Sequence, residues 1–141
     1  MKFITFVWVN SLAVACALLV LSLDQQELNL LCTNTDTQRS SLLDGQMITS
    51  KGSVDTFGTA IVVAGTSSLE IKYPALEQKN VGKFDVIASG DDFVLSQSNS
   101  DTRLSTFKLF RASGHWWGQL VEMDYGVGKT TELITKIYYC G

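Results

Sequence analysis

The sequence predicts an all-β fold, a small antiparallel β-sandwich or β-barrel of about seven or eight strands, preceded by one N-terminal transmembrane helix. Three observations support this prediction. The chain opens with a long uncharged apolar stretch, from Phe3 to Leu23. After residue 46, short runs rich in β-branched and aromatic residues alternate with turn sequences. The cysteines Cys32 and Cys140 bracket this second part of the chain.

The apolar stretch is long enough to cross a membrane. At a helical rise of about 1.5 Å per residue, it covers a hydrocarbon core of roughly 30 Å. Lys2 and the amino terminus precede it, whereas all 14 acidic residues lie at or after Asp24. Because positive charge favours the cytoplasmic side, we expect a cytoplasmic N-terminus and a C-terminal domain that is periplasmic or extracellular.

We expect residues 3–23 to remain in the mature protein as a single membrane anchor. Two alternatives are open. Cleavage after Ser22 would make the stretch a signal peptide. Acylation of Cys16 would make the chain a lipoprotein. More apolar residues follow the small residues 13–15, which disfavours cleavage at that point.

The chain after the anchor is expected to have two parts. Residues 24–31 can extend the helix, with Leu28 and Leu31 on one side. Residues 33–41 are polar without apolar periodicity and indicate a linker. The predicted organisation is therefore an anchor at 1–23, a helix extension and linker at 24–41, and an exported β-domain at 42–141.

About eight strands are predicted from the alternation of β-type runs and turns. Pro74 ends one run because proline cannot donate to a β-ladder. Ser89-Gly90-Asp91 and Ser113-Gly114 predict hairpin turns. The predicted strands cover residues 46–50, 54–64, 69–73, 83–88, 92–97, 103–112, 116–125 and 130–140.

The last strands are expected to supply the centre of the core, because one face of each is more apolar than the other. On residues 116–125 the expected core face holds Trp117, Val121, Met123 and Tyr125, with Glu122 and Asp124 opposite. On the final strand it holds Leu133, Ile137 and Tyr139, with Tyr138 and Cys140 pointing away. This arrangement predicts that Trp116 points outward.

In an oxidising compartment, Cys32 and Cys140 are the natural disulfide pair, and Cys16 is expected to stay free. The bridge would close nearly the whole domain into one loop, which corresponds to a stabilisation of about 4–5 kcal/mol. The alternative is two buried free thiols.

Charge and motif spacing argue against two classes of ligand. The formal net charge of −3 disfavours nucleic acid, which needs a basic patch. Residues 126–130 resemble the end of a phosphate-binding loop, but the required earlier glycine position is Met123. We therefore expect a glycine-rich hairpin there and no nucleotide.

No set of catalytic groups is apparent. His115 is the only histidine, and no Gly-x-Ser-x-Gly elbow or His/Cys metal spacing accompanies it. Glu122 and Asp124, about 7 Å apart on one strand face, would suit glycoside hydrolysis, but alternating charges on a wet sheet face are commoner. We predict no catalytic residue, no metal ligand, no cofactor and no enzymatic activity.

Trp116 and His115 are the candidate binding residues. An outward tryptophan beside a turn often marks an interface or a stacking platform. His115 follows the predicted Ser113-Gly114 turn, where a solvated histidine is the simpler interpretation.

The layout of the chain resembles that of FidL-like membrane proteins of enterobacterial fimbrial regions. The matching features are the anchor at 3–23, Cys32 shortly after it, the run 52–65, and Cys140 at the end. The resemblance implies an accessory role in the cell envelope and no catalytic residue. Lipocalin-like barrels fit less well, since they open with a Gly-x-Trp signature, whereas the tryptophans of this domain come late.

The predicted function is that of a membrane-anchored cell-envelope protein whose exported β-domain binds another protein or assists assembly. The alternatives are a small-ligand-binding β-barrel and, third, an enzyme of unknown type. A dry apolar interior pocket favours the ligand-binding barrel. A continuous exposed apolar strip favours the protein-binding module.

Overall fold

The computed structural model of the chain describes residues 27–43, 46–52, 58–75, 81–125 and 131–141. These residues form nine strands of one antiparallel sheet. The strands are β1 (Leu28–Leu43), β2 (Gln46–Lys51), β3 (Thr59–Ala64), β4 (Ser68–Lys72), β5 (Val81–Gly90), β6 (Phe93–Asn99), β7 (Arg103–Ala112), β8 (His115–Asp124) and β9 (Glu132–Cys140). The predicted anchor, Cys16 and the glycine-rich residues 126–130 lie outside the described residues. Within the described residues, no helix has the length and apolar character needed to span a membrane.

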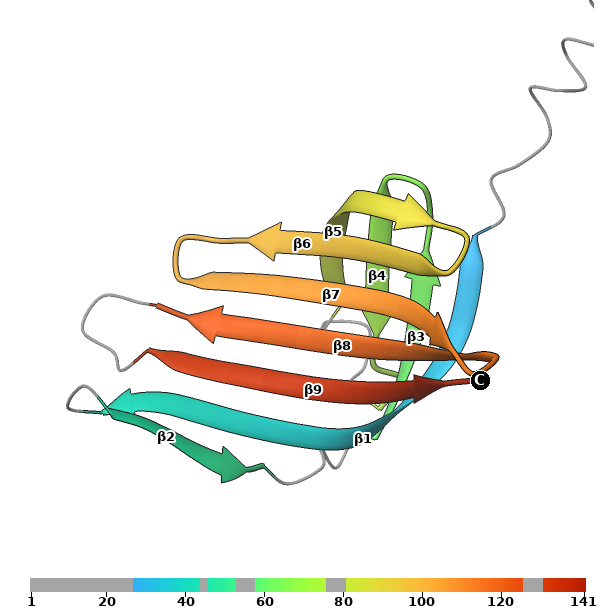
Figure 1. The fold of residues 1–141 in the computed structure, drawn as a ribbon. Helices are drawn as coiled ribbons and strands as arrows, with labels where there is room; N and C mark the ends of the chain where they lie inside the picture. Colours follow the sequence, from blue (N-terminus) through green and yellow to red (C-terminus); the bar gives the residue numbers. More distant parts are fainter. Residues whose placement is uncertain (1–26, 44–45, 53–57, 76–80, 126–130) are drawn as a thin grey trace, which may run out of the picture.

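The sheet closes on itself into an eight-stranded barrel (Figure 1). Strands β3 to β9 follow one another as neighbours, and β1 joins the two ends of this series. Residues 28–33 of β1 pair with β3, and residues 32–41 pair with β9. The all-β prediction is therefore confirmed, and of the two predicted architectures the barrel is the one observed.

The strands β6 to β9 and β1 continue beyond the closed part of the barrel. β1 has 16 residues and β7 and β8 have 10 each, whereas β3 has 6 and β4 has 5. In Figure 1 the strands β6 to β9 and β1 run across the front, and β3 and β4 cross behind their right-hand ends. The additional strand β2 pairs with residues 38–43 of β1. We call the far ends of β7, β8, β9 and β1, together with β2, the sheet extension.

Eight of the nine strands match the predicted set, whereas β1 was not predicted as a strand. The helix extension predicted over 24–31 is wrong for residues 28–31, and the linker predicted over 33–41 is also wrong, because these residues form β1. A polar segment becomes a strand here because its backbone pairs with β9 along one side. Its polar inward side chains are partly satisfied, since the Thr37 hydroxyl donates to Asn34 Oδ1 at 3.3 Å, whereas the buried Asn34 Nδ2 has no hydrogen-bond partner among the described residues. The barrel therefore begins at Leu28, not at residue 42.

The core fills the closed part of the barrel. Phe107 is fully buried, and its ring centroid lies 6.2 Å from those of Phe84 and Tyr138. A Cβ atom at Gly118 would lie 2.8 Å from Phe107 Cζ, so the absence of a side chain makes room for this ring. The other fully buried apolar side chains of the largest size are Leu69, Ile71, Leu109 and Val62.

The inward and outward faces of β8 and β9 are the reverse of those predicted. Leu120 of β8 is 4% exposed and Tyr138 of β9 is 2% exposed. These residues, and the residues two positions before and after each of them, therefore face inward. Trp116 packs against the core, whereas Tyr139 is 36% exposed. The prediction that Trp117 and Tyr139 lie in the core, with Trp116 outward, is wrong. Because side chains alternate strictly along a strand, all the remaining inside and outside assignments on β8 and β9 are reversed as well.

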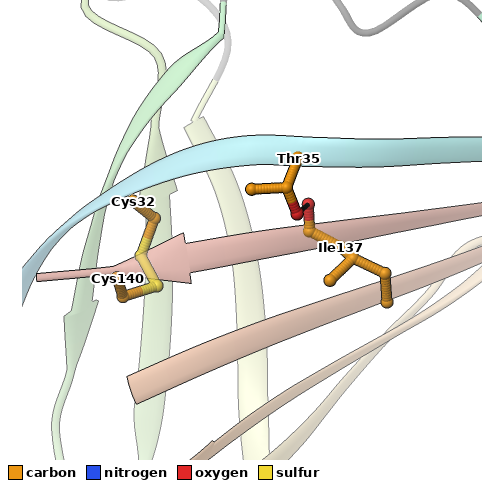
Figure 2. The surroundings of a disulfide bond; sticks show 4 residues. All are labelled: Cys32, Thr35, Ile137 and Cys140. Atoms are coloured by element: carbon orange, nitrogen blue, oxygen red, sulfur yellow. Dashed lines mark hydrogen bonds between the residues drawn. A yellow bond between two sulfur atoms is a disulfide. The ribbon is translucent and has the colours of Figure 1, made fainter. Parts of the chain in front are cut away.

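The predicted disulfide between Cys32 and Cys140 is confirmed. The two residues are direct partners across the β1–β9 seam and are separated by 108 positions in sequence (Figure 2). Further along the same seam, the Thr35 hydroxyl donates to the Ile137 carbonyl at 3.2 Å. A structural disulfide of this kind indicates a domain that folds in an oxidising compartment, outside the cytoplasm.

Candidate binding surfaces

A tight hairpin turn places the two adjacent tryptophans on opposite faces. Ser113 and Gly114 have φ angles of 52° and 79°, which is the left-handed conformation that two-residue β-hairpins require. This turn pairs Phe110 with Trp117 and the next residues, Arg111 and Trp116, with each other. Trp117 therefore faces outward and Trp116 faces inward at the end of the barrel.

Four aromatic residues form a row across the outer face of β6, β7, β8 and β9. Phe93 pairs with Phe110, Phe110 with Trp117, and Trp117 with Tyr139 in the strand register. The Trp117 and Tyr139 rings meet edge to face with centroids 5.2 Å apart. Phe93 is 41% exposed. We call these four residues the aromatic row.

Polar groups accompany the aromatic row. The Tyr139 hydroxyl and His115 Nδ1 share a hydrogen bond of 2.9 Å, and their rings lie 5.5 Å apart. Lys108 Nζ lies 5.2 Å from the centre of the Phe110 ring, within the range of a cation–π contact. The row therefore combines apolar surface with groups that can form hydrogen bonds and ion pairs at its margin.

Further apolar residues lie on the outer face beyond the aromatic row, beside the polar residues Lys108, Gln119, Thr106 and Thr135. Leu104 of β7 pairs with Met123 of β8, which in turn pairs with Leu133 of β9. Val121 and Ile137 lie between this line and the aromatic row, and all five side chains are half-buried. We call these residues, with the aromatic row, the outer apolar face.

The inner side of the sheet extension is charged. Arg103 donates to both carboxylate oxygens of Asp124, at 2.9 and 3.3 Å, and lies 3.6 Å from Glu122. The hydrogen bonds that Arg103 donates to Asp124 raise the pKa of Arg103, and the nearby Glu122 charge adds to this against the opposing effect of burial. Arg39 and Glu132 form a second pair at 3.6 Å. In this part of the sheet, these charged side chains therefore face inward together with Ile134, whereas Leu104, Met123 and Leu133 face outward.

A cavity of about 360 Å³ lies at one end of the barrel. It is lined by the start of β1, the β3–β4 turn, the β5–β6 hairpin and the start of β8. Trp116 is the residue of β8 that lines the cavity, and Leu28 and Val94 add apolar surface. Thr66 and Asp91 bring polar groups to the same cavity.

The two predicted binding residues belong to different surfaces. His115 lies beside the outer apolar face, whereas Trp116 lines the cavity. Sequence reasoning missed Phe93, Phe110 and the role of Trp117. The pairing of these residues could have been predicted from the positions of the hairpin turns, because residues equally distant from a two-residue turn become cross-strand partners.

The other residues considered for chemistry are placed as follows. Glu122 and Asp124 share one strand face as predicted, and both interact with Arg103. His115 is exposed and follows the hairpin turn. Over the described part of the chain, no group of three or more His, Cys, Asp or Glu residues is arranged to hold a metal ion.

The fold and these surfaces define a class of protein, a small disulfide-closed antiparallel β-barrel with an apolar outer face. Neither a protein-family model nor a curated protein matches the chain.

Proposed function

We propose that the chain is a membrane-anchored protein of the cell envelope whose exported β-barrel binds another protein without catalysing a reaction. The outer apolar face of β7, β8 and β9 is the proposed binding surface. The N-terminus lies in the cytoplasm, residues 3–23 cross the membrane, and the barrel lies in the periplasm or outside the cell. The layout resemblance to FidL-like membrane proteins agrees with this proposal.

One observation carries the binding proposal. On β7, β8 and β9 of the sheet extension, Leu104, Met123 and Leu133 lie side by side on the outward face, whereas the ion pairs of Arg103 and Arg39 occupy the inward face. A β-sheet that faces water normally shows the opposite arrangement. Apolar side chains that gather on the water-facing side of a sheet, here with Phe93 and Tyr139 exposed, support a contact site for another molecule.

The composition of this surface favours a protein as the partner. Aromatic residues are enriched at the centres of protein interfaces, where they contribute a large share of the binding energy. Trp117 and Phe110 lie in the middle of the aromatic row, and Lys108 and His115 lie at its margin. An apolar centre with a polar rim is the usual anatomy of such an interface.

Photo-crosslinking from the outer apolar face tests the partner. Benzoylphenylalanine placed at Trp117 in the full chain, within its native membrane, is expected to give a discrete crosslinked species. The matched control is the same photoreactive residue at Glu70, on the outward face of β4 beside Lys72 and Lys83. Adducts from both positions alike, or from neither, would contradict the proposed surface.

The anchor has its own test. We expect the protein extracted from membranes to retain residues 3–23, because this stretch is long enough to span and has no convincing cleavage site. Intact-mass measurement of the extracted protein decides the matter. A mass that lacks roughly the first 22 residues would show a cleaved signal peptide instead.

A further inference from the structure

We propose that the cavity at the end of the barrel binds a small organic cation, a molecule with an apolar body and an amine or ammonium group. This site is separate from the outer apolar face and is independent of the protein-binding proposal. Trp116 and Asp91 are its defining residues.

The cavity has the size and position of a ligand site. Its volume of about 360 Å³ falls within the range of roughly 300–1,000 Å³ that is typical of small-molecule pockets, and the end of a β-barrel is a common place for one. Ala64 and Val94 on its wall are 5% and 8% exposed, so the cavity lies directly on the packed core.

The disulfide lies close to two of the residues that line the cavity. Trp116 is the cross-strand partner of Cys140 on β9, and Leu28 lies four residues before Cys32 on β1. The disulfide between these cysteines joins β1, which carries Leu28, to β9, and β9 is the neighbour of the strand β8 that carries Trp116. A site whose walls are fixed before binding loses little conformational entropy when the ligand enters.

The charge of the lining determines the class of ligand. Asp91 is the one ionisable side chain among the described residues that line the cavity. Arg111, the cross-strand partner of Trp116, lies nearby, since its backbone N–H donates to the Asp92 carbonyl, but it is not one of the lining residues. It lies in the exposed β5–β6 turn, where its carboxylate can be reached from solvent. The indole of Trp116 attracts cations through its π face. A cationic ligand with apolar carbon atoms therefore matches both residues.

The test compares three probes of one shape and different charge: benzylamine, benzyl alcohol and benzoate. The readout is the indole N–H resonance of Trp116 in the full chain in detergent, assigned by its loss in Trp116→Phe. Benzylamine is expected to shift this resonance saturably. Benzyl alcohol is expected to bind roughly tenfold more weakly, because it cannot form a charged contact with Asp91.

Two variants complete the experiment. Asp91→Asn is expected to weaken benzylamine binding roughly tenfold and to leave benzyl alcohol binding unchanged. Asp101→Asn, in the β6–β7 turn at the opposite end of the barrel, is the matched control and should leave both unchanged. Equal binding of amine and alcohol, or an unchanged affinity in Asp91→Asn, would overturn the proposal. The absence of a saturable Trp116 shift with every probe would also overturn it.

Discussion

Replacing both disulfide cysteines, Cys32→Ala with Cys140→Ala, is expected to lower the free energy of unfolding by about 4–5 kcal/mol. The bridge closes a loop with a sequence separation of 108 residues, so it restricts the unfolded chain strongly. It also lies on the β1–β9 seam, where the barrel closes. A domain of this size has about 5–15 kcal/mol in total, so the variant should be close to unfolding at 37 °C.

Urea denaturation of the oxidised parent and of the double variant measures this loss. Cys16→Ala serves as the matched control, because Cys16 lies in the predicted anchor and is expected to be free. Equal midpoints for the parent and the double variant would show that the bridge does not stabilise the barrel. Reduction of the parent with dithiothreitol should reproduce the destabilisation without any change of sequence.

Phe107→Ala is expected to cost about 3–5 kcal/mol, because it removes the largest fully buried side chain of the barrel. The Phe107 ring contacts the space left open by Gly118 and lies between Phe84 and Tyr138. The loss combines the transfer free energy of the removed ring with the cost of the cavity left behind.

Phe110→Ala is the matched control for Phe107→Ala. It removes the same side chain from the same strand, but from the outer face, where Phe110 is half-buried. It should lower the thermal midpoint much less than Phe107→Ala does. The opposite ranking in a pair of thermal melts would mean that the faces of β7, and with them those of β8 and β9, are assigned the wrong way round.

The strand succession was predictable because its signals are local. Turn residues such as Ser113-Gly114 and the end of a run at Pro74 act through the backbone preferences of the residues themselves. The disulfide was predictable because only Cys32 and Cys140 flank the domain. β1 was missed because its residues 33–41 lack an apolar alternation. These residues form a strand because they pair with β9, which lies about a hundred residues away in the sequence.

The polarity of the faces could not be predicted from the alternation alone. The pattern on β8 correctly separated Trp117, Val121 and Met123 from Glu122 and Asp124. The more apolar set was assigned to the core because burial normally follows hydrophobicity. In this protein the closed barrel leaves those apolar residues outside, and Arg103 neutralises the inward carboxylates.

The sequence by itself determined the all-β class, the order of eight strands, the turns between them and the pairing of Cys32 with Cys140. The tertiary structure alone decided the barrel closure, the addition of β1, the outward apolar face and the position of Trp116 at the cavity. The physical reason is that a period of two fixes which neighbours point to opposite sides of a strand. It does not fix which side is inside, because that depends on how distant strands pair and close the sheet.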